Sequence, residues 1–281
     1  HKCFPFIKKD LILMYEKNSN RYEESASVLY ERLIDIGYKN VYYIIDKSNP
    51  VIKNIEDKYL ENFIYKRTLK HYLYFFLTKT FIATEGVANA IDSRVANRFV
   101  LKKIFDTDYM YVFLQHGVMY MVSLSAKLRK FARKTGSKTW KNSKIIVSSD
   151  LEANHFIEYG KFDRNDLYIT GLPKFDRIRR NSSADKILIM PTWRPWEYNE
   201  LSSNPLNTGY YKMIVEIMDS IPNKMRKKVY LLPHPVFLDD MKKTPLKTHI
   251  PIDLSYNEVL SNVKLLITDY SSVSYDAFHR G

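Results

Sequence analysis

The sequence has few of the residues on which several common protein classes depend. Cysteine occurs once, at Cys3, which excludes a disulfide-stabilised scaffold and a cysteine-rich metal site. The eight glycines form neither a Gly-x-Gly-x-x-Gly fingerprint nor a P-loop, so dinucleotide binding or ATP hydrolysis through those loops is not expected. No apolar run approaches the roughly 20 residues that a membrane-spanning helix needs. We therefore expect a soluble or surface-bound protein, and the sequence predicts no cofactor and no metal.

What the sequence has in excess is positive charge. Lysine and arginine number 44 against 31 acidic residues, which leaves a net charge of +13. A charge of this size favours an anionic partner, such as nucleic acid, anionic lipid, or a phosphorylated substrate or polymer. The length of 281 residues fits about two domains at roughly 150 residues each.

Short β-rich runs alternate with stretches of helical periodicity along the whole chain. Strands are predicted at 11–15, 41–45, 81–84, 111–114, 145–148 and 167–170, and then at 187–190, 229–232 and 265–268. Helices are predicted at 22–33, 149–160, 211–220 and 255–261, and from about residue 272, with capping boxes at Asn20–Glu23, Ser149–Glu152 and Ser255–Glu258. Such alternation indicates parallel sheets flanked by helices.

The polar stretch 179–185 separates the two series and is the predicted linker. We therefore predict two Rossmann-like α/β domains, at residues 1–180 and 181–281. The chain begins with His1 rather than methionine and stops at Gly281 inside a predicted helix. We expect it to be a piece of a longer protein whose C-terminal domain is cut short.

Polar residues follow the predicted strands, where open parallel sheets bind their ligands. They are His116 in the first domain, and Thr192, Arg194, His234, Asp269, Ser271 and Ser272 in the second. A histidine beside a glycine at a strand end suits a general base. The guanidinium of Arg194 suits phosphate, and the strand-to-helix turn at 269–272 offers backbone amides and two hydroxyls to an anion.

Each of these residues also has a purely structural interpretation. Asp269 or Ser271 can simply cap the following helix, and a lone histidine such as His116 is more often structural than catalytic. The prolines on both sides of His234 fit an ordinary turn. Arg194 can lie on the surface and stack on Trp193 or Trp196.

A basic segment follows His116. Between Tyr109 and Ser149 there is no acidic residue and there are eight basic ones, and an apolar stripe partly separates from the cations. A basic amphipathic helix of this kind suits an anionic membrane or a polyanionic chain, and a solvated helix is the alternative. The predicted contacts are Lys127, Arg129, Lys130, Arg133 and Lys134.

Five motifs occur in a fixed order. They are Gln115-His116-Gly117, Gly-Leu-Pro-Lys-Phe-Asp at 171–176, Pro-Thr-Trp-Arg at 191–194, His234-Pro235, and Thr-Asp-Tyr-Ser-Ser-Val at 268–273 with Asp276. Together they resemble the CDP-glycerol glycerophosphotransferase family, the teichoic acid primases and polymerases of Gram-positive cell walls. The resemblance runs from about Leu11 to the last residue.

The resemblance implies a GT-B arrangement of two Rossmann-like domains that face each other across a cleft, and catalysis without a metal ion. It implies transfer of glycerol phosphate from CDP-glycerol or a related CDP-polyol to a lipid-linked or polymeric acceptor, at the cytoplasmic face of the membrane. By motif match, His116 is the acceptor-side base. His234, Arg194, Ser271 and Ser272 hold the donor diphosphate, and Asp269 supports that loop.

Three alternatives remain open from the sequence. The first is a GT-B glycosyltransferase that uses a nucleotide sugar. The second is a nucleic-acid-binding protein, although the basic segment contains no recognised binding module. The third is a non-catalytic member of the family, but the presence of both His116 and His234 argues against it.

Overall fold

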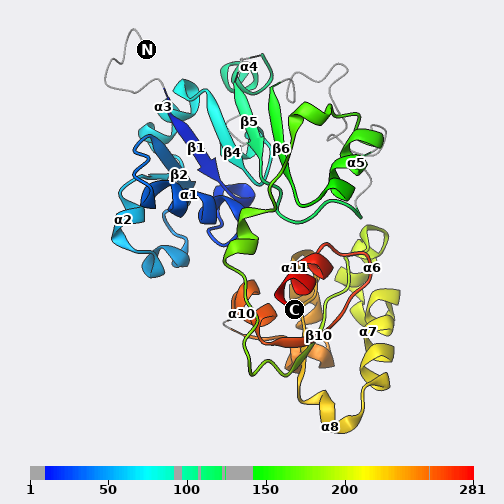
Figure 1. Cartoon of the computed structure of the whole chain (residues 1–281). Helices are drawn as coiled ribbons and strands as arrows, with labels where there is room; N and C mark the ends of the chain where they lie inside the picture. Colours follow the sequence, from blue (N-terminus) through cyan, green and yellow to red (C-terminus); the bar gives the residue numbers. More distant parts are fainter. Residues whose placement is uncertain (1–9, 92–96, 107–108, 122–123, 125–141, 253) are drawn as a thin grey trace. The chain divides into compact units, whose positions relative to one another are not determined.

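The chain folds into two compact units. The computed structural model describes residues 10–91, 97–106, 109–121, 124, 142–252 and 254–281. The first unit ends at Arg177 and the second begins at Ile178 (Figure 1). The boundary between the two units therefore lies three residues before the predicted one, which is between residues 180 and 181. The acceptor and donor roles assigned to the two domains stay predictions.

The first unit contains a parallel sheet of seven strands in the order β3-β2-β1-β4-β5-β6-β7. The strands are β1 (Ile12–Tyr15), β2 (Val41–Ile45), β3 (Phe63–Tyr65), β4 (Thr80–Ala83), β5 (Met110–Phe113), β6 (Ser143–Val147) and β7 (Leu167–Ile169). The sequence predicted all of them except β3, whose three residues are too few to show an alternation. The strand order reverses between β1 and β4, and a ligand site is expected at such a reversal.

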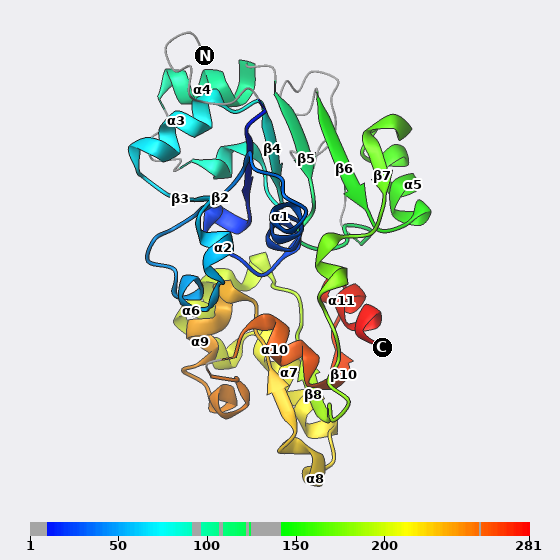
Figure 2. The same ribbon diagram turned by 60° about the vertical axis from the view of Figure 1, so that its left-hand side comes forward.

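Helices cover both faces of this sheet (Figure 2). They are α1 (Ser25–Asp35), α2 (Asp57–Leu60), α3 (Leu69–Leu77), α4 (Arg98–Asp106) and α5 (Asp150–Glu158), with short 3₁₀ turns η1 (Lys17–Ser19), η2 (Pro50–Asn54), η3 (Val87–Ala90), η6 (Arg164–Asp166) and η7 (Pro173–Asp176). Met14 packs with Tyr30 of α1 and Tyr59 of α2, whereas Leu13 and Tyr15 point to the opposite face.

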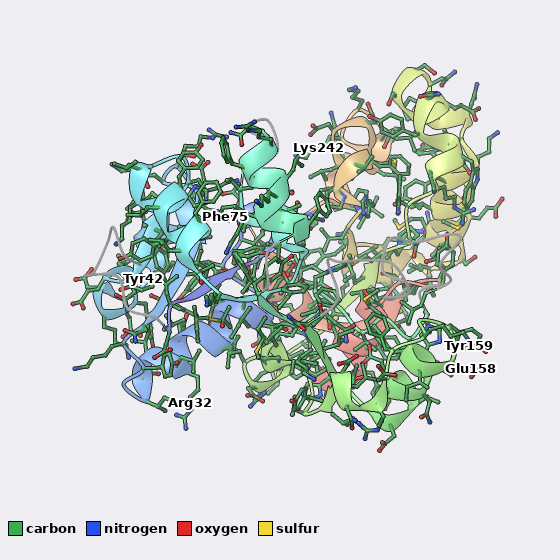
Figure 3. The ribbon with its side chains drawn as sticks, turned by 90° about the horizontal axis from the view of Figure 1, so that it is seen from above. Arg32, Tyr42, Phe75, Glu158, Tyr159 and Lys242 are labelled. Atoms are coloured by element: carbon green, nitrogen blue, oxygen red, sulfur yellow. The ribbon has the colours of Figure 1, made fainter. Side chains whose placement is uncertain are left out.

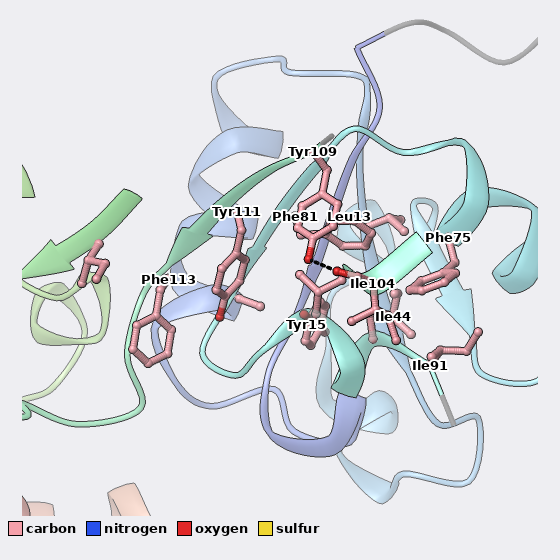
Figure 4. Close-up of a cluster of buried hydrophobic side chains, with 14 of the residues drawn as sticks. Leu13, Tyr15, Ile44, Phe75, Phe81, Ile91, Ile104, Tyr109, Tyr111 and Phe113 are labelled. Atoms are coloured by element: carbon pink, nitrogen blue, oxygen red, sulfur yellow. Dashed lines mark hydrogen bonds between the residues drawn. The ribbon is translucent and has the colours of Figure 1, made fainter. Parts of the chain in front are cut away.

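The larger core lies on the face that α3, α4 and α5 cover (Figure 4). Phe75 of α3 and Phe81 of β4 meet with their ring centroids 5.8 Å apart, and Phe81 also contacts Tyr109 at 5.3 Å. The Tyr109 hydroxyl donates a hydrogen bond of 2.8 Å to the Ile104 carbonyl of α4. These aromatic contacts hold the helices against the strands whose ends carry the polar residues.

The start of α1 differs from the sequence prediction. The capping box predicted at Asn20–Glu23 is wrong, because the helix begins at Ser25. The buried carboxylate of Glu16, directly after β1, accepts the backbone N–H groups of Glu23, Glu24 and Ser27 at 2.8–2.9 Å. A side chain from the preceding strand thus takes the place of a local cap, since the first turn of a helix leaves its amides without partners.

The start of α5 agrees in part with its prediction. The Ser149 hydroxyl accepts the Glu152 amide, as a capping box requires. The Glu152 carboxylate reaches Ser148 instead of the Ser149 amide, so the box is only half formed. At the other end, α5 stops at Glu158, two residues before Gly160, at which the helix was predicted to end. Glu158 and Tyr159 lie exposed (Figure 3).

The second unit contains a parallel sheet of three strands in the order β10-β8-β9. The strands are β8 (Lys186–Ile189), β9 (Val229–Leu231) and β10 (Val263–Ile267). The helices are α6 (Tyr198–Ser203), α7 (Gly209–Ser220), α8 (Asn223–Arg226), α9 (Leu238–Met241), α10 (Tyr256–Ser261) and α11 (Val273–Arg280), with 3₁₀ turns η8 (Pro195–Glu197), η9 (Pro205–Asn207), η10 (Pro235–Phe237) and η11 (Pro245–His249). All three strands were predicted, and the Ser255–Glu258 capping box is confirmed.

This sheet also has helices on both faces. Ile187 and Ile189 pack against Ile214 of α7, whereas Leu188 faces Val259 of α10 and Val273 of α11. The order reverses between β8 and β10. Together with the first unit this confirms the α/β class with two Rossmann-like sheets. In the described ranges, none of the helices has the length and apolarity needed to cross a bilayer.

Replacing Glu16 tests how far α1 depends on its buried carboxylate. Glu16→Ala leaves three amides without their acceptor and should lower the free energy of unfolding by about 2 to 4 kcal/mol. Glu16→Gln should lower the free energy of unfolding by less, because the amide oxygen of glutamine still accepts some of the three backbone N–H groups. Urea denaturation followed by far-UV circular dichroism measures both values. Glu56→Ala, at an exposed position, is the control and should stay within about 0.5 kcal/mol of wild type. An unchanged urea midpoint for Glu16→Ala contradicts the role of Glu16 as the acceptor at the start of α1.

Candidate functional site

His116 follows β5 at the carboxyl edge of the first sheet. The backbone of Gln115 adopts φ +58°, in the left-handed region that costs a residue other than glycine about 1 kcal/mol. The Gln115 side chain is buried and donates to the Ile146 carbonyl of β6 at 2.6 Å. Gln115 therefore stays inside the fold while the next residue, His116, is exposed. The turn presents an imidazole to solvent at the strand end.

The surroundings of His116 keep its ring neutral near pH 7. Its Nδ1 lies 3.5 Å from the Thr84 carbonyl oxygen. Nearby protein atoms that displace water lower the pKa of His116 below the ordinary value, and the charges of Lys17 and Lys174 act in the same direction. The Thr84 carbonyl and Glu85 oppose this shift of the pKa. A neutral imidazole is the form that accepts a proton from a hydroxyl.

Two tyrosines hold the loop after β4 beside His116. The Tyr111 hydroxyl donates to the Glu85 carbonyl at 2.6 Å, and the Tyr15 hydroxyl donates to the carbonyls of Glu85 and Gly86 at 3.3 and 3.1 Å. Burial raises the pKa of both phenols, so they remain donors. The carbonyl of Thr84 that faces His116 is thereby fixed in position.

The residues that follow His116 are also anchored. The buried Glu152 carboxylate accepts the Met119 amide at 2.7 Å, and the amide and hydroxyl of Ser148 at 2.6 and 2.7 Å. From the other side, the buried Lys174 ammonium donates to the His116 carbonyl at 3.0 Å. Lys174 arrives through the turn at Gly171, whose φ of +78° favours glycine. The sequence predicted Glu152 only as part of a capping box, and it predicted no role for Lys174.

In the second unit, Asp269 joins the loops after β8 and β10. Its Oδ1 accepts the Thr192 amide at 2.9 Å and the Thr192 hydroxyl at 2.6 Å. The Thr268 hydroxyl donates to the Met190 carbonyl at 2.7 Å. The structure thus brings the predicted residues Thr192 and Asp269 together at the order reversal of this sheet. Both donors of Thr192 bind Asp269, so any contact of Thr192 with a ligand stays a prediction.

Arg194 lies at the same edge with weak partners. Its Nη2 lies 3.0 Å from the Met213 sulfur, and a thioether is a weak acceptor. Its Nε is buried and has no hydrogen-bond partner among the described residues. An anion offers a guanidinium much stronger bonds. Stacking on Trp193 does not occupy Arg194, because the Trp193 ring stacks on His234 instead, at 5.5 Å.

His234 is held at the end of β9. Its Nδ1 accepts the Val236 amide at 3.3 Å. With Nδ1 as the acceptor, the ring proton is on Nε2, which can donate to an oxygen. The turn geometry expected from the two prolines is present as well, since His234 caps η10.

Ser271 and Ser272 form the approach to α11. The Ser271 hydroxyl accepts the Val273 amide at 3.4 Å, and Ser272 has no side-chain cap bond. Both residues are half-buried. Asp269 does not cap this helix, because its Oδ1 is bound to Thr192 and its Oδ2 accepts no hydrogen bond from the described residues. The start of α11 keeps the positive end of its dipole beside the loop that Asp269 fixes.

Two further residues at this edge, Tyr210 and Glu197, were not predicted from the sequence. Burial raises the pKa of Tyr210 in α7, Asp269 adds to the rise, and Arg194 and the His234 backbone oppose it, which places the phenol near all three. The Glu197 carboxylate accepts the Tyr210 amide at 2.7 Å. The Asp269 Oδ2 is buried and, within the described part of the chain, without a hydrogen-bond partner.

The predicted site residues are divided between the two units, and the predicted basic contacts are not described. His116 belongs to the first unit, and the other predicted site residues belong to the second. Lys127, Arg129, Lys130, Arg133 and Lys134 lie outside the described residues. Within the described ranges, histidine, cysteine and acidic side chains form no group of three that is placed to hold a metal ion.

Comparison with known proteins identifies a family and a fold. A sequence model of the CDP-glycerol:poly(glycerophosphate) glycerophosphotransferase family matches residues 1–278. The minor teichoic acid biosynthesis protein GgaB of Bacillus subtilis is 24% identical over 98% of this chain. The chain spans only 31% of the length of that protein.

Solved structures share the fold. The wall teichoic acid polymerase TagF superposes with a TM-score of 0.62 at 19% identity, over 96% of this chain and 68% of TagF. A putative UDP-N-acetylglucosamine 2-epimerase from Listeria monocytogenes gives a TM-score of 0.54 at 11% identity, over 97% of this chain and 77% of the epimerase. The TagF likeness supports the GT-B-like fold class predicted from the sequence.

The protonation of His116 can be measured directly. In an NMR titration, its pKa should lie below the ordinary histidine value of about 6.5. Lys17→Met removes a positive charge that disfavours protonation, so it should raise the pKa of His116 by a few tenths of a unit. Lys53→Met, at an exposed position on η2, is the matched control and should leave this pKa unchanged. A pKa of His116 at or above 6.5 in the wild type contradicts the described environment.

Proposed function

Because the chain belongs to the CDP-glycerol:poly(glycerophosphate) glycerophosphotransferase family, we propose that it transfers a polyol phosphate from a CDP-polyol to an acceptor hydroxyl. The donor is CDP-glycerol or a related CDP-polyol, and the acceptor is lipid-linked or polymeric. CMP is the released product. The family match over residues 1–278 is the observation that carries this proposal. The polar residues at the two sheet edges provide the chemistry.

The acceptor side of the reaction rests on His116. Its exposed neutral ring accepts the proton of the attacking hydroxyl. The hydroxyl oxygen forms a bond to the phosphorus that carries the polyol. The bond from this phosphorus to the bridging oxygen breaks, and CMP leaves with the electron pair. Reactions of this kind depend on positioning and on neutralisation of charge rather than on covalent catalysis.

The donor side rests on the second unit. Arg194 exchanges its thioether partner for a diphosphate oxygen, which forms a stronger, charge-assisted bond. His234 donates from Nε2, and Ser271 and Ser272 offer hydroxyls at the start of α11. Asp269 holds the loop through Thr192. This set offsets the negative charge that develops on the leaving CMP.

The relatives support the donor assignment. Solved TagF structures include variants with a histidine replaced, and one of these was soaked with CDPG. GgaB is a teichoic acid biosynthesis protein. We propose the same class of pathway for this chain, with a teichoic acid or a capsule polymer as product.

The proposal includes a peripheral location on the cytoplasmic face of the membrane. Its support is the basic sequence at Lys127, Arg129, Lys130, Arg133 and Lys134. Each cation near an anionic lipid surface contributes about 1 kcal/mol. Lys144 is separate from this group, because its ammonium binds the Asn165 carbonyl and lies 3.4 Å from Asp166.

Substrate use tests the reaction. The full-length protein should release CMP from CDP-glycerol or CDP-ribitol only when an acceptor with a free hydroxyl is present. His116→Ala should lower turnover by roughly 10²- to 10⁴-fold with little change in donor binding. His155→Ala, in the same unit, is the control and should keep wild-type turnover. If the protein turned over nucleotide sugars and did not turn over CDP-polyols, it would be a glycosyltransferase and the proposed function would be wrong. Wild-type turnover of His116→Ala would remove His116 from the mechanism.

Arg194 tests the donor site separately. Arg194→Met removes the guanidinium but retains an apolar contact to Met213, and it should weaken CDP-glycerol binding by roughly 10- to 100-fold. Isothermal titration calorimetry with CDP-glycerol measures the effect without turnover. Arg226→Met, in α8 of the same unit, is the matched control, because this half-buried guanidinium binds the carbonyls of Asp219 and Ile221. Equal affinity of Arg194→Met and wild type would exclude Arg194 from donor binding.

A further inference from the structure

The order reversal of the first sheet carries a carboxyl group that the proposed mechanism does not use. Glu24 lies directly before α1, which follows β1, and its side chain is half-buried. It makes no cap bond to its own helix. One of its carboxylate oxygens is buried and, among the described residues, has no hydrogen-bond partner. A buried oxygen of this kind is costly to leave unbonded.

The neighbouring carboxyl, Glu16, shows the contrast. Glu16 is fully buried, and its two oxygens accept three backbone amides. Its hydrogen bonding is therefore complete inside the fold. Glu24 accepts no comparable set of backbone amides, although it lies at the same strand end.

Glu24 and His116 share two neighbours. The Thr84 carbonyl faces the His116 ring, and the Thr84 side chain lies beside the Glu24 carboxyl and favours its ionised form. Lys174 donates to the His116 carbonyl, and its charge also acts on Glu24. Thr84 and Lys174 thus lie near both the Glu24 carboxyl and His116.

Contacts outside the cluster fix this arrangement. The turn η7, which carries Lys174, packs against α1. Arg177 at its end forms an ion pair with Glu31 of α1. The loop that carries Thr84 is held by Tyr15 and Tyr111. Glu24 therefore sits in a rigid frame, as binding groups require.

We propose that Glu24 binds a second, non-reacting hydroxyl of the acceptor, next to the hydroxyl that His116 deprotonates. This inference rests on the proposed function and adds the chemical class of the acceptor end. A group with adjacent hydroxyls, such as a glycerol or sugar end, satisfies both side chains at once. An acceptor with a single hydroxyl satisfies only one of the two side chains.

The charge state of Glu24 fits a hydroxyl ligand. Burial raises its pKa to about 8, the Glu16 carboxylate adds to the rise, and Lys174 and Thr84 oppose it. Near neutral pH the carboxyl is therefore largely protonated. In that state it both accepts and donates hydrogen bonds, which matches a hydroxyl and does not match a phosphate dianion.

A matched pair of acceptors tests the proposal with the full-length protein. The first ends in glycerol phosphate, and the second ends in propane-1,3-diol phosphate, which keeps a primary hydroxyl and lacks the adjacent one. Wild type should prefer the first in kcat/KM by roughly 10- to 100-fold. Glu24→Ala should reduce this preference to within about threefold while the KM for CDP-glycerol stays unchanged. Glu24→Gln retains hydrogen-bonding groups and should keep part of the preference.

Controls separate recognition from damage to the fold. Glu23→Gln, one residue earlier, should keep the wild-type preference, because the Glu23 side chain pairs with Arg21. The urea midpoint of Glu24→Ala shows whether the first unit is intact, and Glu24→Gln decides the question if it is not. An unchanged preference in both Glu24 variants overturns the role of Glu24 and leaves the transferase function standing. No transfer by wild type to either acceptor contradicts the proposed function itself.

Discussion

At Gln115 the backbone leaves the extended region of β5 for φ +58°, and the position of His116 depends on this turn. A straight continuation would keep alternating residues on the two covered faces of the sheet. The left-handed residue interrupts that alternation, so that Gln115 stays buried on the Ile146 carbonyl and His116 reaches solvent. The hydrogen bond offsets part of the about 1 kcal/mol of backbone strain. The loop is then fixed from both sides, by Glu152 at the Met119 amide and by Lys174 at the His116 carbonyl.

The same device recurs at the strand-to-helix loops of both units. Glu16, Glu152 and Glu197 each place a carboxylate on backbone amides that the loop would otherwise leave unbonded. These satisfied carboxylates make the loops rigid. Against that background, Glu24 and Arg194 are among the residues that have buried polar atoms without partners in the described ranges, and both lie at a sheet edge that carries predicted site residues. Because a folded protein satisfies nearly all such atoms, we interpret the exceptions at these two sheet edges as positions that a ligand completes.

The sequence predicted those features that depend on local pattern. Strand periodicity located every strand except β3, and the polar residues after the strands included His116, Arg194 and Asp269. It missed Glu24, Tyr210 and the bond of Glu152 to the Met119 amide, because these roles depend on neighbours brought together by the sheet order. The predicted cap at Asn20–Glu23 failed for the same reason, since Glu16 from the preceding strand supplies the acceptor. Only tertiary contacts distinguish a carboxyl that is satisfied from one that is not.

The account requires that the residues around Asp269 form a diphosphate site that a donor completes. A crystal structure of the protein with CDP-glycerol tests this most directly. The account predicts the diphosphate at the start of α11, within hydrogen-bond distance of Ser271 or Ser272, and the Arg194 guanidinium on a phosphate oxygen instead of on the Met213 sulfur. A diphosphate bound elsewhere, with Arg194 still on Met213, would contradict it.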